Sequence, residues 1–237
     1  MTPAARQRLE VRAPILIVSA AAWMLLILRP HDASAHAHCS GLLATNSPGQ
    51  WGRWALMLVG MMGPLLVAPV LHVRERSFAR RRTRGIALFV LGYGAIWMLA
   101  AVVLMPLASY LTVASGAAIA LLWQWSPLKQ RALNRGHGHP ELAAFGAAAD
   151  AAALRFGLTH GAWCLASCWA LMLLPFLVVH GHLVAMAVVT LWLIAEKLDR
   201  PAKPRWSMRL PLKATRLLVY LSESGFSCLG GCRRISW

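Results

Sequence analysis

Apolar residues fall into six long runs along the chain, separated by short polar connections. About twenty apolar residues are needed for a helix to cross a bilayer, and backbone groups in hydrocarbon are satisfied only in helices or closed barrels. Because the runs are continuous rather than alternating, we predict an all-α, polytopic membrane helical bundle with about six transmembrane helices. The predicted spans are Ala13–Leu28, Trp54–Val73, Gly85–Leu104, about Leu107–Trp125, Leu158–Val179 and Leu183–Ala195.

The composition agrees with this pattern. Hydrophobic residues make up 58% of the chain and charged residues only 14%, with a mean hydropathy of +0.56. Soluble domains carry roughly 25% charged residues. The shortage of charge therefore indicates long segments that tolerate none.

The net charge of +16 is distributed in alternate connections, before the first run, between the second and third, between the fourth and fifth, and after the sixth. This is the positive-inside pattern. It predicts a bacterial inner-membrane protein with both termini in the cytoplasm, and it argues against nucleic acid as a partner. Trp51, Trp54, Trp123 and Trp125 lie near span ends, where we expect them to anchor the interface.

Four regions follow from these runs. Residues 1–30 form an N-terminal anchor span, 31–53 an external His-rich loop, 54–198 a five-span membrane core, and 199–237 a basic cytoplasmic tail. The first region also fits the template of a signal peptide, because small residues at Ala33, Ala35 and Ala37 could mark a cleavage site. An uncleaved anchor is the favoured interpretation, and cleavage would leave five spans.

Candidate metal chemistry begins in the fifth run. His160, Cys164, Cys168 and Met172 recur every four residues and so share one slowly winding helix face. Imidazole, thiolate and thioether suit Cu(I), with Zn(II) as a less favoured competitor. Cys and Met are also ordinary packing residues, which is the preferred interpretation for Met172 alone.

The second run adds Met57, Met61 and Met62, followed by Pro64 and Pro69. Proline is expected to kink or locally open the helix. Thioethers beside a kink could line a Cu(I) site, although methionines in such a run more often serve packing.

Accessory ligands are candidates outside the spans: His36, His38 and Cys39 in the external loop, and His137 and His139 in an inner loop. Short His tracts are modest signals for metal binding. Glu196 could complete a site with His160, but an ion pair with the adjacent Lys197 is the preferred interpretation.

Several segments together resemble a bacterial family of predicted metal-binding integral membrane proteins of unknown function, described as copper-chaperone-like. The resemblance covers roughly residues 50–200 and rests on Trp54–Met57, Met61–Met62, Pro64, Leu88–Phe89, Gly92–Tyr93, Trp97, Gln124, Ser126–Lys129, Ala153–Met172 and Glu196–Lys197. It implies the same multi-span architecture and a copper-related role.

Members of that family typically carry further cysteines, and this chain has Ala132, Gly136 and Ser167 at the corresponding places. His137 and His139 are candidates to replace the loop pair. Loss of metal binding is the alternative, so the resemblance supports the architecture more firmly than an intact site.

No Walker loop, dinucleotide fingerprint or nucleophile elbow occurs, and no carboxylate pair lies within a span. We therefore predict a non-enzymatic membrane protein that binds or delivers copper(I), or zinc. The expected partners are the lipid bilayer and a metal-donor or metal-acceptor protein or membrane complex. A metal-free assembly subunit of a larger membrane complex is the alternative, and a small-molecule permease is a weaker one.

Overall fold

The computed structural model describes residues 3–28, 48–143, 145–178, 181–199 and 201–206. Within these ranges all regular structure is helical, which confirms the all-α prediction for this part of the chain. The elements are α1 (Pro3–Leu28), α2 (Pro48–Met62), η3 (Gly63–Leu66), α3 (Val67–Arg76), η4 (Ala79–Arg81), α4 (Arg82–Ser109), α5 (Val113–Trp125), α6 (Pro127–Gly136), α7 (Gly146–Leu177) and α8 (His182–Leu198).

Four helical segments are long and apolar enough to cross a membrane: Leu9–Leu28, Gly49–Arg76, Ala79–Ser109 and Gly146–Leu177. Their outward side chains are apolar too. Ile17, Leu99 and Leu191 are each about two-thirds exposed, on α1, α4 and α8. Surfaces of this kind are unfavourable in water, and they suggest an integral membrane protein.

The remaining two predicted spans correspond to shorter helices. The prediction of one span from Leu107 to Trp125 is wrong, because α4 continues to Ser109 and the chain turns before α5. The polar residues responsible form a capping box: the Thr112 side chain accepts a hydrogen bond from the backbone N–H of Ser115, and the Ser115 hydroxyl accepts one from that of Thr112. With 13 residues in α5 and 17 in α8, the six-span count stays a prediction.

Pro64 opens the helix of the second span locally, as predicted, while the segment stays helical from α2 to α3. The helix passes from α2 through the 3-10 turn η3, which carries Pro64, into α3. In a continuous helix the carbonyl of Gly60 would accept from residue 64, but proline has no N–H. Ser19 and Trp23 of α1 replace that donor, with the hydroxyl at 2.7 Å and the indole nitrogen at 3.3 Å from the Gly60 oxygen. The kink thus fixes α1 against α2.

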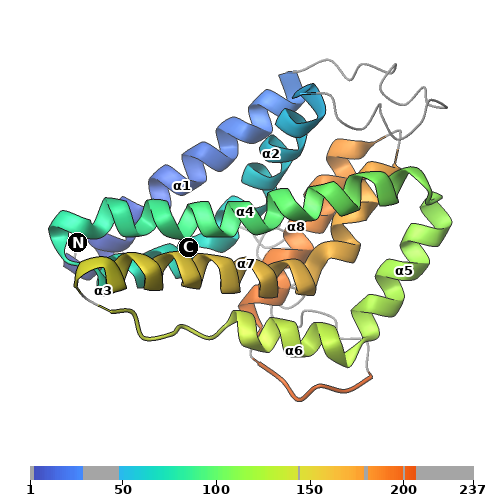
Figure 1. Ribbon diagram of the computed structural model, residues 1–237. Helices are drawn as coiled ribbons and strands as arrows, with labels where there is room; N and C mark the ends of the chain where they lie inside the picture. The colour runs from blue at the N-terminus through green and yellow to red at the C-terminus, as the bar shows by residue number, and fades with distance from the viewer. Residues whose placement is uncertain (1–2, 29–47, 144, 179–180, 200, 207–237) are drawn as a thin grey trace, which may run out of the picture.

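Ion pairs gather where α1, α3, α4 and α7 meet. Arg74 lies 2.6 Å from Glu10, and Asp150 accepts from Arg81 at 3.0 Å and from Arg84 at 2.8 Å. We call this part of the molecule the charged end. α4 and α7 both start there and run side by side in the same direction (Figure 1).

Glycines let α4 and α7 approach closely. A Cβ atom on Gly157 would lie 2.2 Å from the carbonyl oxygen of Phe89, and one on Gly92 would lie 2.7 Å from that of Leu154. Gly157 and Gly161 are four residues apart and both face α4, the small-residue spacing typical of helix contacts in membranes. This contact sets the position of the fifth predicted span and the side chains that it carries.

Candidate metal centre

The four residues of the predicted ligand stripe are all buried on α7. His160, Cys164, Cys168 and Met172 are 6%, 3%, 1% and 0% exposed. Starting from the charged end, the order along the helix is imidazole, two thiols, then thioether. Twelve residues at about 1.5 Å each place the two ends of this column roughly 18 Å apart.

The two thiols are free and lie on adjacent turns of α7. The Sγ atom of Cys168 lies 2.9 Å from the carbonyl oxygen of Cys164, which also accepts from the Ser167 hydroxyl at 2.7 Å. Tyr93 of α4 places its hydroxyl 3.3 Å from the Sγ atom of Cys164. Each thiol therefore has a polar neighbour in an otherwise apolar interior.

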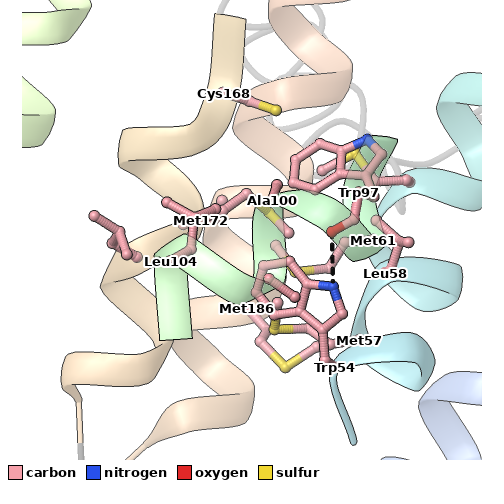
Figure 2. Close-up of a cluster of buried hydrophobic side chains, with 14 of the residues drawn as sticks. Trp54, Met57, Leu58, Met61, Trp97, Ala100, Leu104, Cys168, Met172 and Met186 are labelled. Atoms are coloured by element: carbon pink, nitrogen blue, oxygen red, sulfur yellow. Dashed lines mark hydrogen bonds between the residues drawn. The ribbon is translucent and has the colours of Figure 1, made fainter. Parts of the chain in front are cut away.

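Six methionines from four helices belong to the same buried core as these thiols. We call them the thioether cluster: Met57, Met61 and Met62 of α2, Met105 of α4, Met172 of α7 and Met186 of α8. Figure 2 labels Met57, Met61, Met172 and Met186 around Trp54 and Trp97, with Cys168 farther along α7. The structure thus brings the predicted methionines together, and it adds two that sequence reasoning missed. These two are Met105 and Met186. Each is a single methionine within an apolar run, so no spacing pattern in the sequence marks it as a candidate ligand.

Trp54 also belongs to this core, so the prediction that it anchors the membrane interface is wrong. It is 1% exposed, stacks on Phe176 with ring centroids 5.4 Å apart, and donates its indole N–H to the carbonyl oxygen of Trp97 at 3.3 Å (Figure 2). Its ring instead packs in the same buried core as the thioether cluster.

His160 lies in an aromatic cage at the other end of the column. Its ring centroid is 5.6 Å from that of Phe156, 6.0 Å from Phe89 and 6.2 Å from Tyr93. Neither ring nitrogen has a hydrogen-bond partner within the described part of the chain. An imidazole in this environment keeps its nitrogen lone pair available to a ligand.

Glu196 does not pair with Lys197, contrary to the preferred prediction. Its Oε1 atom lies 2.6 Å from the Nζ atom of Lys129 and accepts from Trp192 at 2.8 Å and from Gln124. Lys129 is only 2% exposed, although its place between two runs suggested an aqueous loop. Burial lowers the pKa of Lys129, while the charge of Glu196 opposes that shift.

The other carboxylate oxygen of Glu196, Oε2, is buried and has no hydrogen-bond partner among the described residues. A small crevice joins this carboxylate to the thiols, since Cys164, Ser167, Cys168, Glu196 and Lys197 line it together with leucines. His160 is not part of that lining. The predicted combination of Glu196 with His160 is thus replaced by a combination of Glu196 with the two cysteines.

The predicted accessory residues differ in their availability. His137 has one ring nitrogen 2.7 Å from the carbonyl oxygen of Leu133 and the other 3.2 Å from that of Lys197, so both nitrogens face backbone oxygens in this structure. His139 lies against His72, and burial followed by the charge of His72 lowers the pKa of His139. His36, His38 and Cys39 lie outside the described residues.

Among the described residues, no three His, Cys, Asp or Glu side chains are grouped closely enough to hold a metal ion by themselves. The donors that the fold does gather are thiols and thioethers. Such soft sulfur ligands select Cu(I). Any ion held here would thus combine cysteine with methionine.

The long apolar helices and apolar outer faces suggest a membrane protein, and its buried core is rich in sulfur side chains. A family model described as "Copper chaperone" (PpoB2) matches residues 51–215. The chain belongs to this family, which agrees with the resemblance in the sequence. No curated protein and no solved structure matches the chain.

Proposed function

We propose that this chain is an integral protein of the bacterial inner membrane that binds Cu(I) and passes it along α7. The observation that carries the proposal is the buried column of His160, Cys164, Cys168 and Met172, met at its thioether end by methionines of three other helices. Family membership supports copper as the cargo.

The order of donors supports movement as well as binding. Thioethers of the cluster are neutral ligands, the two thiols can become anionic, and His160 offers nitrogen towards the charged end. Each is a known ligand type for copper, and the sulfur ligands are softer than the imidazole nitrogen at the far end of the column. An ion could therefore exchange between neighbouring ligands without crossing bare hydrocarbon.

The topology that goes with this function is the predicted one, with six spans and both termini in the cytoplasm. The charged end would then be cytoplasmic, in keeping with the positive-inside rule, and α5 and α8 would act as short spans. We further propose that the protein catalyses no reaction, that it contacts lipid and a metal-donor or metal-acceptor protein, and that it does not bind nucleic acid.

The test is the Cu(I) content and affinity of the full chain purified in detergent, measured by competition with a chromophoric Cu(I) chelator. Cys164→Ala/Cys168→Ala should lower the affinity by at least about tenfold, or about 1.4 kcal/mol. Met24→Leu is the matched control, because Met24 is 55% exposed on α1. A copper-free wild-type protein would contradict the proposal and favour a metal-free assembly subunit. Equal affinities for both variants would contradict the two cysteines as ligands and so the route along α7.

A further inference from the structure

Two histidines from distant parts of the sequence meet at the charged end. His72 lies on α3, and His139 follows α6 in the connection to α7. Their ring centroids are 4.9 Å apart with the ring planes at 60°. His72 is half-buried and His139 is exposed, so the pair lies at the boundary between the protein interior and its surface.

A hydrogen bond to the backbone orients the ring of His72. The Nε2 atom of His72 lies 2.9 Å from the carbonyl oxygen of Pro140. Because a carbonyl can only accept, Nε2 is the donor, and in the neutral ring this leaves the lone pair on Nδ1. Imidazoles held through one nitrogen and free at the other are the usual arrangement of histidine ligands to metals.

Phe156 connects the pair to the α7 column. Its ring centroid lies 5.7 Å from that of His72, 6.4 Å from that of His139 and 5.6 Å from that of His160. The two histidines are therefore the next nitrogen donors beyond His160, towards the charged end.

We propose that His72 and His139 form a second, two-imidazole Cu(I) site from which the ion leaves for an aqueous acceptor. Imidazole is a suitable copper ligand. Metal–imidazole nitrogen bonds are about 2.0 Å long, so rings this close can reach one ion by rotating their side chains. The site rests on the proposed function for its cargo, but its ligands share no residue with the thiol site.

The experiment counts Cu(I) ions bound per full-length chain in detergent, with X-ray absorption to separate nitrogen from sulfur ligation. Wild type should bind at two sites. His72→Ala/His139→Ala should lose one ion together with the nitrogen-only component, and Cys164→Ala/Cys168→Ala should lose the sulfur component. His139→Ala alone should weaken the nitrogen site at least tenfold, and its exposed position makes misfolding an unconvincing explanation.

The control is His182→Ala. His182 lies at the start of α8, and its ring nitrogen also faces a backbone carbonyl, that of Pro175. Unchanged stoichiometry and affinity in the His72/His139 variants would overturn the second site while leaving the proposed function intact. Loss of nitrogen ligation in those variants, with no effect of the cysteine substitutions, would support this site and overturn the thiol route. No Cu(I) on the wild type would overturn both.

Discussion

The hydroxyl group of Tyr93 on α4 lies 3.3 Å from the Sγ atom of Cys164 on α7. Both residues are buried, and the glycine contacts between the two helices fix their separation. The phenol can donate to sulfur, so it would stabilise a Cys164 thiolate bound to a cation. The contact between α4 and α7 therefore positions Tyr93 beside the candidate metal ligand Cys164.

Replacing Tyr93 with Phe should weaken Cu(I) binding by about tenfold, because a hydrogen bond to a charged group is worth about 1.5–3 kcal/mol and sulfur is a weak acceptor. Thermal unfolding should change much less. Chelator competition measures the affinity, and Tyr110→Phe is the matched control, since Tyr110 is 73% exposed beyond the end of α4. Equal affinities in the two variants would contradict a hydrogen bond from Tyr93 to a metal-bound Cys164.

Met61→Leu should lower the Cu(I) affinity at least about tenfold while costing less than about 1.5 kcal/mol of unfolding free energy. Leucine conserves the volume of this fully buried side chain but has no thioether. The same chelator assay and a thermal melt separate the two effects. If Met61→Leu behaves like Met24→Leu, the thioether cluster serves packing alone.

Gly157→Ala should destabilise the protein by about 1–3 kcal/mol, because the new methyl group would press on the backbone of Phe89. Gly94→Ala is the opposite case on the partner helix: its Cβ meets nothing within 4 Å, and alanine is favoured over glycine in helices by about 0.8–1.0 kcal/mol. Thermal unfolding in detergent should therefore shift in opposite directions. A shift of the same sign in both would contradict the close α4–α7 contact.

Much of this architecture could be read from the sequence, since continuous apolar runs and prolines act locally. The apolar runs predicted the four long helical segments, and Pro64 predicted the local opening of the helix before α3. The spacing of His160, Cys164 and Cys168 placed them on one helix face. The four-residue spacing of Gly157 and Gly161 was also visible, and it could have predicted the contact with α4.

Other features depend on tertiary packing and left no local signal. Lys129 follows an apolar run, so its charge suggested an aqueous loop, whereas α6 folds back against α7 and buries it. Met186 joins Met57 and Met61 only because α8 packs beside α2. The partner of Glu196 was mistaken for the same reason: the neighbour in sequence, Lys197, is not the neighbour in space.

The buried pair of Lys129 and Glu196 leads to the sharpest test of the fold around the crevice. Lys129→Met should cost about 3–5 kcal/mol, because it leaves the carboxylate of Glu196 buried without its cation. The double variant Lys129→Met/Glu196→Gln should recover most of that loss, since no uncompensated charge remains. Unfolding free energies of the two single variants and the double variant give the coupling energy.

Lys197→Met is the control for this cycle. Its Nζ atom contacts the carbonyl oxygen of Gly136 at 3.4 Å rather than Glu196, so it should show little coupling to Glu196→Gln.

The stability conferred by Lys129 should also depend on pH in a defined direction. Burial lowers the pKa of Lys129 in the folded state, so the unfolded chain holds more protons between that pKa and the ordinary lysine value of about 10.4. The free energy of unfolding should rise with pH across this window, and Lys129→Met should remove that rise. In the mutant cycle, a large coupling energy between Lys197→Met and Glu196→Gln would contradict the pairing of Glu196 with Lys129.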